Sequence, residues 1–366
     1  MINTHVVTIT GYGSGGEGVG RLPDGKVVFV RGAARGDVLE VRLVKELPRS
    51  AWGELMRVLM VSPYRVKPDC PYYPRCGGCD FRHISYEEEL SVKLQRVNDA
   101  LKRIGGVHVR ADEILTTGQT SGYRNKAVFH SDGVSWGFYG AGSRELIPVE
   151  RCSLLKGDLN FALGGLSADG RVSEIILRSG CNGLSPPLEE ELDGLVFQIS
   201  GFFQVNTDAA LLLFQRAREY AAMSAAEVLV DLYCGVGALA IFVGRDAGWV
   251  LGVELNPASI DAARVNASRN GFSHIDFISA DASKWDGGGV APDCVIVDPP
   301  RSGLSKAAVR KILELSPKRV VYVSCDPATM ARDIKLLEGF SLARVCAVDM
   351  FPRTANVESC CLLVRS

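Results

Sequence analysis

The sequence contains no apolar run approaching the ~20 residues that a membrane-spanning helix needs, although 47% of its residues are hydrophobic. Its first ten residues, MINTHVVTIT, also lack the basic start and the continuous apolar core of a secretory signal. These two absences exclude a membrane helix and a signal peptide. We therefore expect a cytoplasmic protein with no membrane partner.

An excess of charge of one sign is missing as well, because the formal net charge is -1 at pH 7. This balance excludes a generally basic surface, so any binding of nucleic acid must come from local patches. One such patch is indicated at the N-terminus. Residues 1–67 carry ten Lys or Arg and six Asp or Glu, which leaves four positive charges in excess.

Cysteine, in contrast, is plentiful, with eleven residues. In a reducing compartment disulfides are the less favoured use of cysteine, so clustered cysteines indicate metal binding or catalysis. Five cysteines in apolar or strand-like stretches are interpreted as small core side chains: Cys181, Cys294, Cys346, Cys360 and Cys361. Four others follow the pattern C-x5-C-x2-C and a distant C: Cys70, Cys76, Cys79 and Cys152. Four thiolates can hold zinc or an iron–sulfur cluster, and the spacing alone leaves both open.

The 366 residues exceed what one hydrophobic core usually supports, so two or three domains are expected. Residues 1–62 alternate short β-branched runs with glycine turns, which predicts a small closed antiparallel barrel. Residues 63–205 indicate a β-rich central domain, in which one long helix over 85–104 is expected to pack on the domain that follows. In residues 206–366 helices alternate with buried strands, beginning with a helix over 208–223, and this predicts a parallel doubly wound sheet. The predicted fold class is multidomain α/β plus β.

A glycine loop, DLYCGVG at residues 231–237, follows the first strand of this C-terminal domain. Ligands of doubly wound sheets bind at the carboxyl ends of the strands, where glycine lets the backbone come close to the ligand. Glu254 ends the next strand and can accept ribose hydroxyls, and Asp281 follows the third strand, where it can hold an adenine amino group. The third glycine of the GxGxxG fingerprint is missing. The pattern favours a nucleoside cofactor without a diphosphate, although a GxG turn alone also occurs for packing reasons.

Reactive side chains follow the fourth and fifth strands. Asp298 precedes two prolines, which have a fixed φ and make the segment rigid. Cys325 ends the fifth strand directly before a predicted helix, whose partial positive charge favours the thiolate. A lone cysteine in this position is more often a packing residue, so its interpretation as a nucleophile depends on its neighbours. Glu358, in FPRTANVESC, is the candidate general base, and the alternative for it is a solvated or capping acid.

Five motifs, taken in their order along the chain, resemble those of a known family: GFFQVN at 201–206, DLYCGVG at 231–237, DPPR at 298–301, SCDPATMARD at 324–333 and FPRTANVES at 351–359. The family is the RNA 5-methyluridine methyltransferases, which modify uracil in ribosomal or transfer RNA, and the resemblance spans nearly the whole chain. It implies a C-terminal Rossmann-like domain that binds S-adenosylmethionine, with Cys325 as the nucleophile and Glu358 as the base. It also implies seven cofactor-binding residues: Gln204, Tyr233, Gly235, Gly237, Glu254, Asp281 and Asp298.

The chemistry of such an enzyme requires both groups. Carbon 5 of uracil is too weak a nucleophile to take a methyl group directly, so a thiolate first adds to carbon 6. After methyl transfer, a base must remove the hydrogen on carbon 5 before the cysteine can leave. Cys325 and Glu358 are expected in these two roles.

The resemblance further identifies residues 1–62 as a TRAM domain, an oligonucleotide-binding-like (OB-like) barrel that holds RNA. Four of its residues are expected at the RNA: Tyr12, Lys26, Arg31 and Arg35. In family members with the four-cysteine pattern those cysteines bind a [4Fe-4S] cluster, which is expected here to brace the central domain. The combination of this barrel with the cysteines favours 23S ribosomal RNA as the substrate, with transfer RNA as the alternative. We expect a monomer.

Three positions depart from the family pattern. Asp326 stands beside Cys325 where an asparagine is usual, Asn356 stands where a histidine is usual, and Ala238 replaces a threonine. A carboxylate beside the thiol is expected to raise its pKa or to engage a partner elsewhere.

Three other activities remain open from the sequence. An N-methyltransferase often has an aromatic residue after its DPP element, where this chain has Arg301, and would not need Cys325 or Glu358. A catalytically silent RNA-binding protein would keep the fold without the chemistry. An iron–sulfur radical enzyme is the least favoured, because four cysteines would fill all four iron sites of a cluster.

Overall fold

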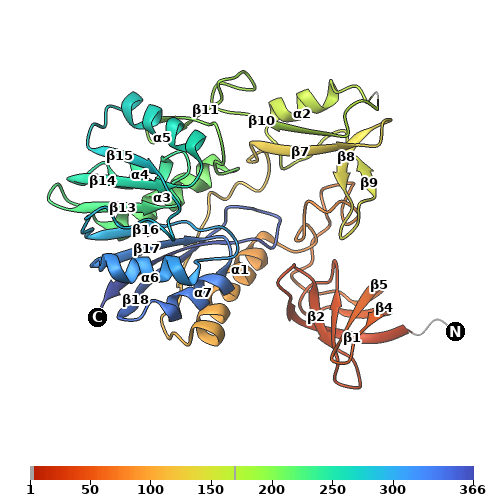
Figure 1. Ribbon diagram of the computed structural model, residues 1–366. Coiled ribbons are helices and arrows are strands. Elements are labelled where there is room, and N and C mark those ends of the chain that lie inside the picture. Colours follow the sequence, from red (N-terminus) through yellow and green to blue (C-terminus); the bar gives the residue numbers. More distant parts are fainter. Residues whose placement is uncertain (1–3, 169) are drawn as a thin grey trace.

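The computed structural model describes residues 4–168 and 170–366. These residues form a small barrel, a central sheet and a larger α/β domain. In Figure 1 the barrel lies at the lower right, the central sheet at the upper right and the α/β domain on the left. No helix within these two ranges is both long and apolar enough to cross a membrane.

Five N-terminal strands close into a barrel in the order β1-β2-β3-β5-β4. Their bounds are β1 (Thr4–Tyr12), β2 (Gly18–Arg21), β3 (Val27–Val30), β4 (Val38–Glu46) and β5 (Ser50–Met60). Alternate residues point inward, and Val28, Leu39 and Val41 are fully buried in the barrel. The predicted closed barrel is confirmed, except that β3 and β5 pair in parallel.

The central domain is a four-stranded antiparallel sheet in the order β10-β7-β8-β9, with one helix against it. The elements are β7 (Lys126–Ser131), β8 (Trp136–Tyr139), β9 (Leu146–Pro148), α2 (Gly157–Gly164) and β10 (Glu174–Arg178). Phe129 and Leu159 are fully buried between sheet and helix. The cysteine-bearing segment 61–85 contains no helix and runs between the barrel and this sheet (Figure 1).

The long helix predicted over 85–104 is observed as α1 (Tyr86–Ala100), followed by a π-helical turn (Leu101–Gly105). Ser85 starts it by accepting a hydrogen bond from the Glu88 N–H. The helix packs on α7 of the C-terminal domain, and β6 (Ile114–Leu115) extends that domain's sheet. A segment from the middle of the chain therefore completes the C-terminal domain. The division into domains at 1–62, 63–205 and 206–366 remains a proposal.

The C-terminal domain is built on an eight-stranded sheet in the order β15-β14-β13-β16-β17-β19-β18-β6. The strands are β13 (Val228–Leu232), β14 (Trp249–Glu254), β15 (Ile275–Ser279), β16 (Cys294–Val297), β17 (Arg319–Ser324), β18 (Phe340–Val348) and β19 (Glu358–Arg365). The expectation of a wholly parallel sheet is wrong at β19, which runs antiparallel between β17 and β18. A short loop joins β18 to β19, and a direct reversal of the chain can only produce an antiparallel pair.

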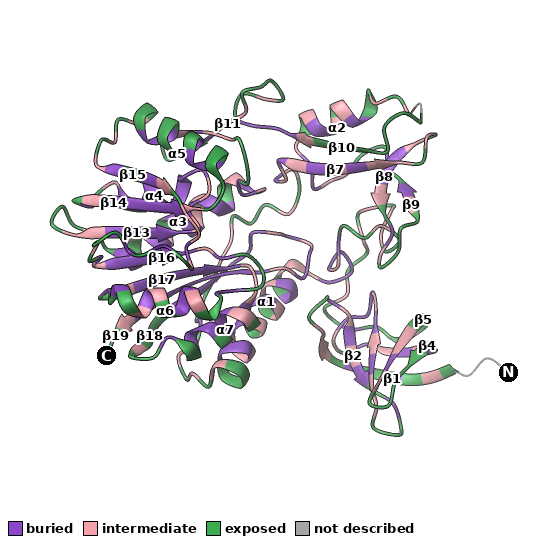
Figure 2. Cartoon of the chain, viewed as in Figure 1, coloured by how far each residue is buried: buried purple, intermediate pink, exposed green. Residues whose placement is uncertain are grey.

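Helices cover both faces of this sheet, so its central strands are buried on both sides (Figure 2). One face carries α3 (Thr207–Ala221), α4 (Ala238–Gly244) and α5 (Pro257–Arg269), with the hairpin of β11 (Glu189–Leu192) and β12 (Leu195–Gln198) beside them. The other face carries α1, α6 (Lys306–Leu315) and α7 (Pro327–Leu336). Four of the five cysteines interpreted as core residues are fully buried, whereas Cys181 is exposed, which corrects that prediction.

Candidate active site

One cavity at the carboxyl edge of the sheet gathers most of the residues singled out in the sequence. Its volume of about 620 Å³ lies within the ~300–1,000 Å³ usual for ligand pockets. Eight predicted site residues line it: Gln204, Tyr233, Gly235, Glu254, Asp281, Asp298, Cys325 and Glu358. They come from seven different segments of the chain, so only the folded sheet brings them together.

The antiparallel strand β19 explains why Glu358 lies near Cys325. Cys325 follows the last residue of β17, and Glu358 is the first residue of β19. Since the two strands run in opposite directions, the end of one meets the start of the other, and Ser324 pairs with Ser359. A parallel strand at this position would have placed Glu358 at the opposite edge of the sheet.

The loop after β13 lines the cavity with Tyr233 and Gly235. Tyr233, Gly235 and Gly237 all have positive φ, at 73°, 54° and 79°, a region that favours glycine. Gly237 has a packing role: a Cβ atom there would lie 2.8 Å from the Phe277 ring. Gly237 therefore lets the start of α4 pack closely against β15 and α5, and it is the one predicted cofactor residue that does not line the cavity.

Backbone N–H groups donate hydrogen bonds to two of the carboxylates that are expected to bind the cofactor. Glu254 accepts hydrogen bonds from the N–H groups of Gly235, at 3.3 Å, and Asn256, at 2.9 Å. Asp281 accepts from the backbone and hydroxyl of Ser283, at 2.9 and 2.6 Å, and these bonds lower its pKa. These hydrogen bonds fix the orientation of both side chains.

Buried carboxyl groups dominate the electrostatics of the site. Burial raises the pKa of Asp298 to about 7, and burial together with Asp298 raises the pKa of Glu358 to about 8, with Arg301 opposing. Asp231, in β13, is 1% exposed, and neither of its carboxylate oxygens has a hydrogen-bond partner of ordinary geometry among the described residues. Burial and the nearby Asp298 and Glu254 raise its pKa well above the usual value. Asp231 was not predicted as a site residue. The signal that could have identified it is an acidic residue within an apolar strand.

The thiol of Cys325 is less acidic than the sequence suggested. Burial, Glu358 and Asp298 raise its pKa to about 11, and Arg301 opposes them. Burial and these carboxyl groups therefore outweigh the effect that the N-terminus of α7 was expected to have on the thiol. Asp326 caps that helix and accepts hydrogen bonds from the N–H groups of Ala328 and Thr329 at 2.8 and 2.9 Å, so those donors are already engaged.

The loop between β18 and β19 is fixed from two sides, which positions Phe351 and Glu358 on the cavity wall. From α1, the fully buried Lys93 donates to Asp349 at 2.6 Å and to the Phe351 carbonyl at 3.0 Å. From the cysteine-bearing segment, Asp80 accepts a hydrogen bond from the Ala355 N–H at 3.0 Å. The loop that leads into Glu358 is therefore held by contacts with segments far away in the sequence.

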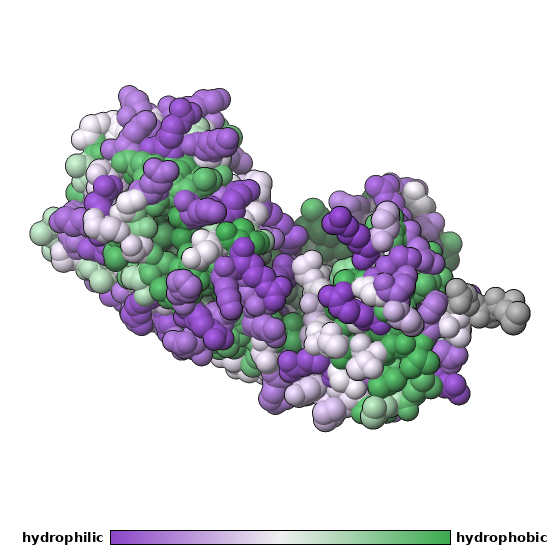
Figure 3. Space-filling model, turned by 90° about the horizontal axis from the view of Figure 1, so that it is seen from below, coloured by the Kyte–Doolittle hydropathy of each residue, from purple (hydrophilic) through white to green (hydrophobic). Residues whose placement is uncertain are grey.

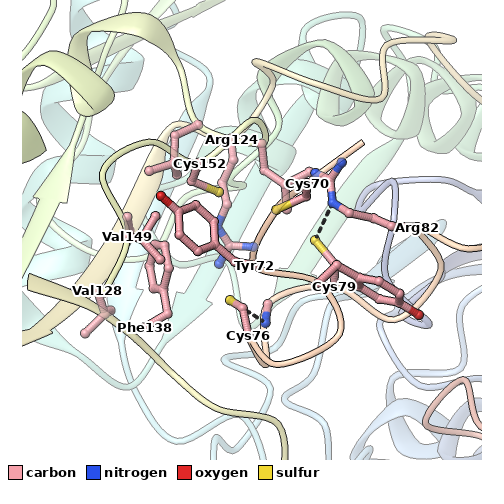
Figure 4. A pocket seen from close by; sticks show the side chains of 15 residues that line it. Cys70, Tyr72, Cys76, Cys79, Arg82, Arg124, Val128, Phe138, Val149 and Cys152 are labelled. Carbon is pink, nitrogen blue, oxygen red and sulfur yellow. Dashed lines mark hydrogen bonds between the residues drawn. The ribbon is translucent and has the colours of Figure 1, made fainter. Parts of the chain in front are cut away.

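The four cysteines of the predicted cluster line a second cavity of about 190 Å³. Figure 4 shows Cys70, Cys76 and Cys79 on one loop, with Cys152 of the central domain across the cavity from them. The Arg82 Nε donates to the Cys79 Sγ at 3.2 Å. Within residues 4–168 and 170–366, no group of three or more His, Cys, Asp or Glu side chains is already arranged around a common metal position.

The barrel residues expected at the RNA are engaged within the protein: Tyr12, Lys26, Arg31 and Arg35. The Tyr12 hydroxyl accepts from the Arg35 N–H at 2.9 Å, and the Arg35 guanidinium pairs with buried Glu88 at 2.7 Å. Arg31 donates to the Cys79 carbonyl at 3.1 Å, and Lys26 pairs with carboxylates of its own barrel. Tyr12 also contacts the Phe81 ring edge-on. Three of the four thus join the barrel to the rest of the chain, and the side chains of Arg31 and Arg35 remain 38% and 33% exposed.

Comparisons with known proteins agree with this architecture. A family model described as tRNA (Uracil-5-)-methyltransferase matches residues 195–286 and 289–366, and a TRAM domain model matches residues 4–56. The chain is 33% identical to an uncharacterized RNA methyltransferase of Caldanaerobacter subterraneus, over 98% of this chain and 97% of that protein. It is 34% identical to one of Thermosynechococcus vestitus, over 96% of each.

Among solved structures, the tRNA (uracil-54, C5)-methyltransferase of Pyrococcus abyssi, in complex with S-adenosyl-L-homocysteine, has the same fold. Its TM-score is 0.80 at 24% identity, over 98% of this chain and 100% of that one. The agreement extends from the barrel to the last strand of the sheet. Together with the relatives at 33 and 34% identity, these matches show that the chain belongs to the RNA methyltransferases of the uracil-C5 family.

Proposed function

We propose that this protein transfers a methyl group from S-adenosylmethionine to carbon 5 of a uridine in RNA. The observation that carries the proposal is that Cys325 and Glu358 line one cavity, at the edge of the sheet where the predicted cofactor residues converge. A thiol and a carboxyl group in one site are the pair that this reaction needs.

The chain's own residues have separate tasks in the reaction. The Cys325 thiolate adds to carbon 6 of uracil, which forms a C–S bond and makes carbon 5 nucleophilic. The bound cofactor supplies an electrophilic methyl group, which carbon 5 accepts. The Glu358 carboxylate then takes the hydrogen of carbon 5 as a proton. The electrons of that C–H bond restore the C5–C6 double bond and expel Cys325 as a thiolate.

The cavity fits a cationic nucleoside cofactor. Asp231 and Asp298 are buried carboxyl groups, and neither oxygen of Asp231 has a hydrogen-bond partner of ordinary geometry among the described residues. A cation in the cavity would offset the cost of ionising these two groups. Glu254 would accept the ribose hydroxyls, Asp281 the adenine amino group, and Gln204 would contact the part of the cofactor nearest to Asp298. S-adenosylmethionine carries a sulfonium charge and therefore suits this charge pattern better than a neutral nucleoside does.

The charge pattern predicts a pH dependence of cofactor binding. Asp298 and Glu358, with pKa values of about 7 and about 8, are largely protonated at pH 6. A bound sulfonium favours their ionised forms, so binding releases protons and becomes tighter as the pH rises. We expect the dissociation constant of S-adenosylmethionine to fall by roughly three- to tenfold between about pH 6 and 8, and that of S-adenosylhomocysteine to change much less. Isothermal titration calorimetry would measure both, and equal slopes for the two ligands would refute the role of the carboxylates.

We propose ribosomal RNA, and 23S RNA in particular, as the substrate, because the barrel and the four cysteines occur together in this chain. The descriptions of the matching family model and of the Pyrococcus abyssi structure favour transfer RNA as the second candidate. Mass mapping of 5-methyluridine in RNA from a strain that lacks the gene decides between them. The proposal predicts the loss of one 5-methyluridine from 23S RNA, restored by the wild-type gene. Loss from transfer RNA would support the alternative, and an unchanged pattern in both would count against the function.

We also propose that the protein is a cytoplasmic monomer.

We further propose that the four cysteines bind a [4Fe-4S] cluster. They come from two distant segments and line one cavity, and the same cavity is lined by Arg82 and Arg124, whose charges would balance a cluster held by four thiolates. Protein purified without oxygen is expected to contain iron and acid-labile sulfide in equal amounts, and Cys152→Ala should lose both. Zinc without sulfide in the wild-type protein would show a structural zinc site instead.

A further inference from the structure

Cys325 can be approached from two sides. Besides the cofactor cavity, a groove of about 580 Å³ reaches it, and the two hollows share Cys325 and Arg301. The groove is lined by the first loop of the barrel, by α1 with its π-helical turn, and by the start of α7. It leads from the surface to the reactive thiol without passing the predicted cofactor residues.

The barrel forms one wall of this groove in a fixed position. The Arg96 guanidinium, from α1, donates to the Ser14 carbonyl of the barrel at 3.0 Å and to the Ala355 carbonyl of the loop between β18 and β19 at 2.8 Å. A Cβ atom on Gly16 would be 2.8 Å from the Asp80 side chain of the cysteine-bearing segment and 3.3 Å from the Ala355 side chain of the loop between β18 and β19. In Figure 3, hydrophilic side chains gather where the barrel meets the larger body.

The charges of the groove suit a polyanion. Arg103 is 75% exposed and has an ion pair with Asp99 at 3.4 Å, which water and salt weaken at such an exposed position. Arg301 is exposed at the inner end. The other acid of the groove, Asp326, is engaged by the N–H groups of α7. Two guanidinium groups can therefore turn to phosphate without breaking a buried interaction.

We propose that this groove holds the sugar–phosphate backbone beside the target uridine, and that Arg103 contacts a phosphate. The inference rests on the proposed function, because it needs a base that leaves its stack and reaches Cys325 from the groove side. The barrel then acts as a wall of the active site, in addition to any contact with RNA farther away.

The test compares two single substitutions in the full-length protein, Arg103→Gln and Lys102→Gln. Both remove one positive charge from the π-helical turn, and both side chains are exposed, but Lys102 does not line the groove. The probe is a fluorescein-labelled oligouridylate of about twelve nucleotides, whose binding is followed by anisotropy over a range of KCl concentrations. Arg103→Gln is expected to weaken binding roughly fivefold and to reduce the salt slope by about 0.7, whereas Lys102→Gln should change the affinity less than about twofold. Equal effects of the two substitutions would overturn the inference.

Two further measurements separate this inference from the proposed function. Binding of S-adenosylmethionine should be the same in both variants, since neither residue lines the cofactor cavity. If the wild-type protein methylates uridine but the variants bind the probe equally, the groove assignment fails and the function stands. If the variants differ as expected but the wild type forms no 5-methyluridine, the function fails and the groove remains a binding site.

Discussion

Replacing Cys325 by alanine is expected to lower the rate of uridine methylation by at least ~10³-fold. Without the thiol, carbon 5 of uracil cannot become nucleophilic, and no other thiol of the described residues lines the cavity. The side chain is small and only half-buried, so the fold and the affinity for S-adenosylmethionine should not change. The measurement is transfer of a tritiated methyl group to RNA. Cys181→Ala is the matched control, because that cysteine is exposed and outside the cavity.

The same variant decides between the activities that the sequence left open. Wild-type protein incubated with S-adenosylmethionine and RNA that contains 5-fluorouridine should form a covalent adduct, because the base cannot remove fluorine from carbon 5. The adduct should survive in a denaturing gel and be missing with Cys325→Ala. Ordinary turnover by Cys325→Ala would instead indicate an N-methyltransferase, and binding without turnover by the wild type would indicate a silent RNA-binding protein.

Replacing Glu358 by glutamine is expected to lower turnover by about 10²- to 10⁴-fold and to trap a methylated covalent complex on ordinary RNA. Glutamine has nearly the same shape but cannot accept the proton of carbon 5, so the reaction stops before Cys325 leaves. Mass spectrometry of the trapped species should show RNA joined to the protein, with one added methyl group. Release of the product at the wild-type rate would exclude Glu358 as the base.

The Glu358→Gln variant should also have a more reactive thiol in the free protein. Glu358 is one of the groups that raise the pKa of Cys325 to about 11, and above pH 8 its own carboxyl is mostly ionised. Removing that negative charge lowers the thiol pKa. Alkylation of Cys325 by iodoacetamide at about pH 9 is therefore expected to be roughly two- to tenfold faster, for a pKa change of about 0.3 to 1. Cys181 in the same digest provides the reference rate.

The departure at Asp326 has a structural explanation. Its carboxylate caps α7 through two backbone N–H groups, and an asparagine side chain offers an oxygen for the same task. Of the two outcomes expected from the sequence, engagement of a partner is the one observed. The pKa of Cys325 is raised mainly by the burial of the thiol and by the nearby carboxyl groups of Glu358 and Asp298.

The sequence by itself determined most of the site residues and their order along the chain, although it missed Asp231 and included Gly237, which does not line the cavity. Glycine loops, buried strands and capping residues are local patterns, which depend on neighbours in the chain, and they placed Cys325, Glu254 and Asp298 at strand ends. The same local patterns predicted the N-terminal barrel and the alternation of helices and strands in the last domain. The four cysteines were likewise recognisable from their spacing.

Only the tertiary structure decided how these residues act together. The reversal at β19 brings Glu358 to Cys325, and burial beside carboxyl groups, rather than the helix N-terminus, governs the thiol pKa. Arg35 pairs with Glu88 of α1, and Tyr12 contacts Phe81 of the cysteine-bearing segment. The reason is physical: burial, pairing and electrostatic environment depend on which distant segments pack together, and no local pattern contains that information.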